Sequence, residues 1–123
     1  MLPPKPIETR ADVEFMVHTF YKKVLDDALL APHFAHVNWE LHMPRMIQFW
    51  CFVLLDTEGF TGNVFDKHVH LDIGKEHFTR WLALFHDTVN THFTGPKADL
   101  ANQRAELLGY TFSTKMEQLK KDK

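Results

Sequence analysis

The chain has 123 residues, of which 45% are hydrophobic and 24% charged, so we expect one compact domain over residues 1–123. Fourteen basic against sixteen acidic residues give a formal net charge of −2, which removes the electrostatic case for nucleic-acid binding. The single cysteine excludes an intrachain disulfide and favours a reducing, cytoplasmic compartment; the sequence shows neither a signal-peptide pattern nor the roughly 20 apolar residues of a membrane span.

Helical periodicity begins after an amino-terminal extension, residues 1–8. The three-four spacing of one buried face runs through Val13, Met16, Val17, Phe20, Tyr21, Val24 and Leu25. Thr9, three residues before Asp12, fits the start signal of such a helix. The rhythm breaks after Asp26, and Pro32 predicts a turn-rich corner near Phe34 and Asn38.

A second helix is predicted from about Trp39 to Leu55. One face carries His42, Met46, Phe49 and Val53, and a neighbouring face carries Trp39, Met43, Trp50 and Leu54, so this helix is buried over a wide arc. Pro44 has no amide hydrogen and is best tolerated in a first turn, which predicts a start near Leu41 or a bend there.

Residues 56–74 show three glycines and no clean period, which predicts a long connection with at most a short helical turn. Long irregular segments in compact domains are often functional. Because this segment contains His68 and His70, we expect the chemistry of the protein here.

Two more helices complete the chain. The third is predicted from about Lys75 to Phe93, with Phe78, Trp81, Leu82, Phe85 and Val89 inward, and Gly95-Pro96 ends it. The fourth is predicted from Lys97 to Leu119, with residues 120–123 as a solvated tail. No segment alternates as a strand does, so the predicted fold class is all-α.

Most of the nine histidines are interpreted as ordinary surface or boundary residues: His18, His33, His36, His77, His86 and His92. His42 differs because it lies on an apolar face, where its ring needs either a protein partner or a ligand. His68 differs because an irregular segment can aim its side chain at a cavity. Tyr21 and Trp81 each place one hydrogen-bond donor on an inward stripe, as core aromatics or as ligand contacts.

Taken together, these side chains match what a ligand-binding haem requires. An imidazole anchors the iron on one side, and donors in an apolar, Phe-rich cavity stabilise a diatomic ligand on the other. The chain has 11 phenylalanines to line such a cavity.

The sequence resembles the group III truncated haemoglobins over roughly residues 9–118. The resemblance is carried by Phe20-Tyr21 with Val24, Pro32-His33-Phe34, Trp39-Glu40-Leu41-His42-Met43-Pro44, Phe49-Trp50, His68-Val69-His70-Leu71, and the run from His77 to Phe85. The paired-glycine signals of other truncated globin groups are missing. No single piece is specific, but the combination is.

The resemblance implies a shortened globin fold, a two-over-two sandwich of four helices around a haem b, iron protoporphyrin IX. His68 becomes the proximal iron ligand, Tyr21 and Trp81 the distal donors, and His42 a distal gate or additional contact. Met46 and Phe49 are implied to line the distal pocket, and Phe34 to pack against the porphyrin.

His70 is a rival for the iron, but it requires a two-residue shift from the family spacing, and we place it near a haem edge or propionate. Arg45 and Lys67 are candidate propionate partners, since a propionate favours a cation or water; a solvated surface position explains both equally well.

The expected ligands are dioxygen, carbon monoxide and nitric oxide. Hydrogen bonds from two distal donors, Tyr21 and Trp81, predict slow dioxygen release. Slow release suits a redox function, or detoxification of nitric oxide and peroxide, better than oxygen delivery. Whether the protein is an enzyme stays open: dioxygenase or peroxidase-like turnover needs an external reductant, because the chain has no room for a reductase domain.

Three alternatives remain. A non-haem di-iron bundle uses Glu-x-x-His pairs, which are missing here. Ligation by Cys51 is disfavoured because this residue falls away from the His42 face. A helical interaction module would pack its aromatic stripes only against each other.

Overall fold

The computed structural model describes residues 3–35, 37–56 and 74–121, and of residues 116–121 the backbone only. Its α-helices are α1 (Arg10–Asp26), α2 (Trp39–Leu55), α3 (Lys75–His92) and α4 (Pro96–Lys121), with a short 3-10 helix, η1 (Ala31–Phe34), between α1 and α2. The described residues form no strand, so the all-α prediction is confirmed. Helix α4 extends two residues into the expected tail.

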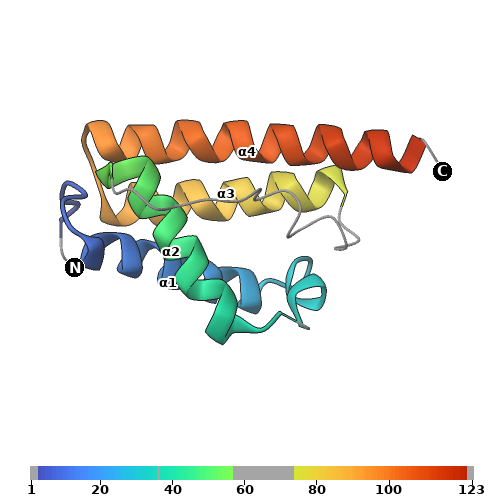
Figure 1. The fold of residues 1–123 in the computed structure, drawn as a ribbon, viewed down its shortest axis with the longest axis horizontal. Coiled ribbons are helices and arrows are strands. Elements are labelled where there is room, and N and C mark those ends of the chain that lie inside the picture. Colours follow the sequence, from blue (N-terminus) through green and yellow to red (C-terminus); the bar gives the residue numbers. More distant parts are fainter. Residues whose placement is uncertain (1–2, 36, 57–73, 122–123) are drawn as a thin grey trace.

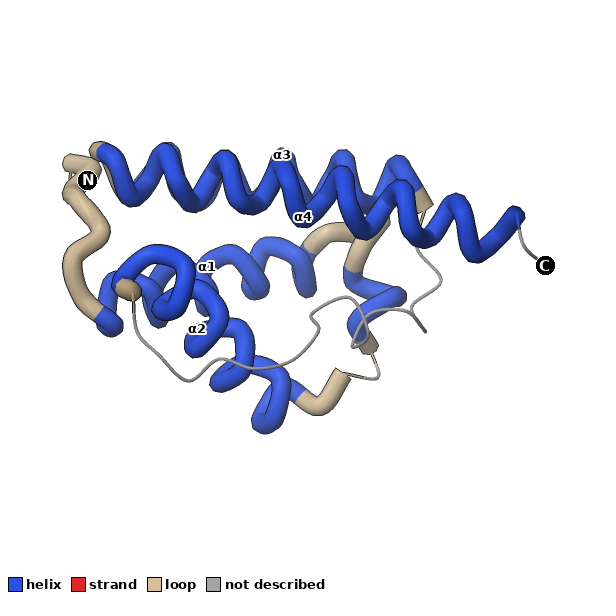
Figure 2. Tube along the Cα trace, turned by 45° about the horizontal axis from the view of Figure 1, so that its top comes forward, coloured by secondary structure: helices blue, strands red, loops and turns tan. Residues whose placement is uncertain are grey.

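The four helices form two layers, as expected. Helices α3 and α4 lie antiparallel in one layer, while α1 and α2 cross in the other (Figures 1 and 2). Contacts join the helices within each pair, α3 with α4 and α1 with α2, and across the layers, α1 with α3 and α2 with α4. This two-over-two arrangement encloses one hydrophobic core to which every helix contributes.

Helix α1 begins where the sequence predicted. The Thr9 hydroxyl accepts from the Asp12 amide (3.3 Å) and the Asp12 carboxylate accepts from the Thr9 amide (3.1 Å), a capping box that satisfies amides otherwise left unpaired. The predicted inward face is buried except at Leu25, which is 41% exposed. Each four-residue step rotates a helix by about 40°, so Leu25 has turned away from the stripe that starts at Val13.

Helix α2 begins earlier than Leu41. The Asn38 side chain accepts from the Glu40 amide (3.2 Å), so the first residue is Trp39 and Pro44 lies inside the helix. Pro44 has no N–H to donate back to the Glu40 carbonyl. Both residues are exposed, which leaves that carbonyl within reach of water.

The amino-terminal extension is part of the packed structure. The Lys5 amide donates to the His92 carbonyl (3.2 Å), and the Thr94 amide donates to the Lys5 carbonyl (3.0 Å). Ile7 is only 1% exposed. These contacts fasten residues 5–7 beside the end of α3.

Asp27 ties the end of α1 to α3. Its side chain, 5% exposed, accepts from Nε of Arg80 at 2.6 Å and from the amides of Leu29 (3.0 Å) and Leu30 (3.2 Å). The bond from Arg80, with those from the backbone, holds the pKa of the Asp27 carboxyl below its ordinary value. Asp27 therefore fixes both the helix pair and the turn that leads to η1.

Replacing Asp27 by Asn should lower the thermal unfolding midpoint at pH 7, because the charge that pairs with Arg80 is lost. A carboxyl with a lowered folded-state pKa stabilises the fold above its unfolded pKa of about 4, and this contribution disappears as the pH falls through the folded value. The difference in thermal unfolding midpoint between the wild type and Asp27→Asn, measured by circular dichroism, should therefore narrow below about pH 4. Asp26→Asn, on an exposed residue, is the control; an equal difference at pH 7 and pH 3 would contradict the ion-pair account.

Candidate functional site

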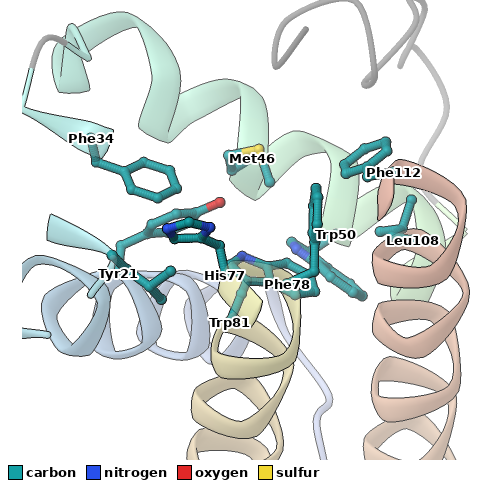
Figure 3. A pocket seen from close by; sticks show the side chains of 10 residues that line it. Tyr21, Phe34, Met46, Trp50, His77, Phe78, Trp81, Leu108 and Phe112 are labelled. Carbon is teal, nitrogen blue, oxygen red and sulfur yellow. The ribbon is translucent and has the colours of Figure 1, made fainter. Parts of the chain in front are cut away.

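A cavity lies between the two helical layers and takes side chains from all four helices (Figure 3). It contains about 580 Å³ of empty space, a volume that includes space open to solvent. Most of its lining is apolar and aromatic. The lining residues are Tyr21, Leu30, Phe34, Met46, Trp50, His77, Phe78, Trp81, Leu108 and Phe112.

Two of the polar side chains in this lining, Tyr21 and Trp81, are bonded to each other. The Trp81 indole, which has only a donor, donates to the Tyr21 hydroxyl. Burial raises the pKa of the Tyr21 phenol well above its ordinary value, and the bond from Trp81 lowers it by less. Tyr21 is therefore neutral, and its own hydroxyl hydrogen is available for an acceptor in the cavity.

Aromatic packing fixes the plane of Trp81. Its indole stacks on Phe85 (ring centroids 5.8 Å apart, 16° between planes), and Trp50 stacks on Phe85 as well (5.0 Å, 23°). Phe20 meets Trp81 edge-on at 5.4 Å. Such contacts leave the indole little rotational freedom, so its N–H is aimed by packing before any ligand arrives.

Four of the predicted site residues line the cavity: Tyr21, Phe34, Met46 and Trp81. His42 is not part of the lining but contacts Tyr21. Its ring meets Tyr21 edge-on (centroids 5.8 Å apart, 83°) and Trp39 in the same way (5.3 Å, 77°).

Two other predicted residues face elsewhere among the described parts of the chain. Phe49 is buried but packs against Trp50 (centroids 5.2 Å apart), and it is not part of the cavity lining. Arg45 is exposed on α2. His68, His70 and Lys67 lie outside the described residues, so their roles stay predictions.

His77 is the functional candidate that sequence reasoning missed. It was interpreted as a boundary residue, yet it lines the cavity and its side chain is only 13% exposed. Its Nδ1 accepts from the Gly74 amide at 2.8 Å, at the start of α3. The available signal was its spacing, because His77 and Trp81 are four residues apart and so share one helical face.

The described residues contain no group of three or more His, Cys, Asp or Glu side chains that could hold a metal ion by themselves. Cys51 is buried, and burial raises the pKa of its thiol, which disfavours the thiolate that would bind a metal. No helix in the described ranges has the length and apolarity needed to cross a membrane.

Comparison with known proteins places this geometry in context. No protein-family model matches the chain. The Group 3 truncated hemoglobin ctb of Campylobacter jejuni is 28% identical over 104 residues, which cover 79% of this chain and 82% of that protein. The crystal structure of the group III truncated hemoglobin from Campylobacter jejuni superposes with a TM-score of 0.81 at 24% identity, covering 93% of this chain and 95% of the other. The predicted resemblance to the group III truncated haemoglobins is therefore confirmed: the chain has the truncated-globin fold and a group III member as its curated homologue.

Proposed function

We propose that the chain is a haem protein that binds dioxygen and other diatomic ligands at an iron held by His68. The observation that carries the proposal is the bonded pair of Tyr21 and Trp81, which faces a largely apolar cavity inside a truncated-globin fold. The truncated haemoglobin homologue supports a globin-type haem protein. The haem type, b, is inferred from the resemblance to the group III truncated haemoglobins. The physiological role is inferred from Tyr21 and Trp81.

The described residues fit a porphyrin. A porphyrin is flat, largely apolar and polar along one edge, and this cavity is lined by aromatic rings with a few donors (Figure 3). Phe34 and Met46 would pack on the ring, and His68 would hold the iron from the segment outside the described residues. When bound, the haem supplies an iron that takes diatomic ligands.

Tyr21 would be the direct donor to a ligand in the cavity. Its hydroxyl accepts from Trp81, so its own hydrogen points to a different acceptor. Accepting one hydrogen bond polarises a hydroxyl and strengthens the bond that it donates. In this arrangement Trp81 acts through Tyr21, whereas the sequence suggested two independent donors.

A strongly held ligand suits redox chemistry or detoxification of nitric oxide and peroxide better than oxygen delivery. His42, whose ring meets Tyr21 edge-on, would restrain the phenol ring or gate the cavity. Any catalytic cycle requires electrons from a separate reductase. The cytoplasm, expected from the single cysteine, supplies such donors.

Haem binding is tested by the absorption spectrum of the purified protein in its ferric, reduced and carbon monoxide-bound forms. We expect a strong Soret band that shifts on reduction and on carbon monoxide, and that is lost or rearranged in His68→Ala. His18→Ala, on an exposed residue of α1, is the control and should leave the spectrum unchanged. A folded, colourless protein that takes up no added haemin would favour the helical interaction module.

Removing the Tyr21 hydroxyl should accelerate dioxygen release from the haem-loaded protein. A hydrogen bond to a charged acceptor contributes about 1.5–3 kcal/mol, so stopped-flow measurements should show roughly a ten- to hundredfold faster rate in Tyr21→Phe. Trp81→Phe should have a smaller effect, and the double variant should release no faster than Tyr21→Phe, because Trp81 acts through Tyr21. Additive effects of the two substitutions would instead indicate two independent donors.

The raised pKa of Tyr21 makes a prediction for alkaline conditions. An ordinary tyrosine begins to ionise as the pH approaches about 10 and would stop donating. Because burial raises the Tyr21 pKa further, the release rate should stay constant between about pH 8 and 10. A transition in this range that is absent from Tyr21→Phe would show that the phenol titrates normally.

A further inference from the structure

The hydrogen bond from Gly74 determines which nitrogen of His77 carries the proton. Nδ1 accepts from the Gly74 amide at 2.8 Å, so it uses its lone pair and carries no hydrogen in this structure. The neutral ring must then carry its proton on Nε2, which makes Nε2–H a donor. No bond to this Nε2 forms within the described part of the chain.

A second contact holds the His77 ring in place. His33, on η1, meets it at 4.4 Å between ring centroids and 73° between planes. With Gly74 on one side and His33 on another, the ring is oriented by the protein itself. Glu76, whose Oε1 is 3.8 Å from Nδ1, lies on the solvent side and is 73% exposed.

His77 brings to the cavity an N–H donor, at Nε2, that no residue in the described ranges accepts. The other lining residues with a hydrogen-bonding side chain are Tyr21, Trp50 and Trp81, and of these Tyr21 and Trp81 bond to each other. The cavity is also asymmetric. His77 lies toward the end marked by Phe34, and Leu108 and Phe112 of α4 lie at the opposite end (Figure 3).

We propose that His77 is a cofactor-binding residue that donates from Nε2 to a carboxylate on the edge of the porphyrin, with His33 as its support. This inference rests on the proposed haem function and adds a recognition element to it. A porphyrin edge presents either apolar substituents or propionates, and a mostly buried N–H donor matches only the propionates. The apolar substituents then face Leu108 and Phe112. His77 takes the part that the sequence suggested for Arg45, which is exposed on α2.

The test compares haemin with haemin dimethyl ester, in which both carboxylates are esterified. Affinities are obtained from the quenching of tryptophan fluorescence, since Trp50 and Trp81 both line the cavity. In His77→Phe, haemin should bind about tenfold more weakly, because a charge-assisted hydrogen bond is lost at a partly exposed site. Binding of the dimethyl ester should change little. His77→Gln, which keeps an N–H donor, should retain part of the preference for haemin, and His18→Gln should match the wild type.

Each other outcome overturns the proposal. Equal weakening of haemin and its ester would mean that His77 only supports the start of α3 through Gly74. Unchanged affinity for both would mean that His77 contacts no carboxylate. A changed ferric absorption spectrum in His77→Phe would place the ring at the iron. If the wild type binds neither porphyrin, the haem function itself fails, which separates that failure from the failure of this inference.

Discussion

A buried phenol has to find a hydrogen-bond partner, and in this protein the partner is an indole from another helix. Tyr21 belongs to α1 and Trp81 to α3, so their bond holds only if the two helices keep a fixed distance and rotation. Because the Trp81 N–H is used in this bond, it is not available to a ligand, and the Tyr21 hydroxyl hydrogen points to a different acceptor. The chemistry proposed for the site and the dependence of Trp81 on Tyr21 follow from this one contact, while burial keeps Tyr21 neutral.

The rest of the fold maintains that distance. Asp27, which directly follows α1, bonds Arg80, the residue next to Trp81, and Lys23 bonds Asp87 (2.7 Å), so two ion pairs join the carboxyl-terminal end of α1 to α3. Stacking on Phe85 fixes the plane of the Trp81 indole. Hydrophobic burial brings the layers together without specifying rotation, whereas these directional contacts select one rotation of each helix.

Local patterns and the family resemblance predicted the helices and four of the ten residues that line the cavity. The three-four spacing predicted all four helices, the pair of Thr9 and Asp12 predicted a helix start, and inward stripes predicted Tyr21 and Trp81. The rest depends on contacts far apart in the chain. Helix α2 is buried over a wide arc, so periodicity alone did not decide that Trp50, and not Phe49, reaches the cavity. The spacing of four residues to Trp81 indicates the face on which His77 lies, but its ring contact with His33 of η1 joins distant parts of the chain, and no local pattern encodes it.

The central claim is that Tyr21 donates to a ligand on a haem in this cavity and that Trp81 reinforces it. The infrared C–O stretch of the carbon monoxide-bound ferrous protein reports directly on such a donor, because a hydrogen bond to the ligand oxygen weakens the C–O bond and lowers its frequency. The account predicts one low-frequency band that rises strongly in Tyr21→Phe and by a smaller amount in Trp81→Phe. A band that stays at the same frequency in both variants would contradict it.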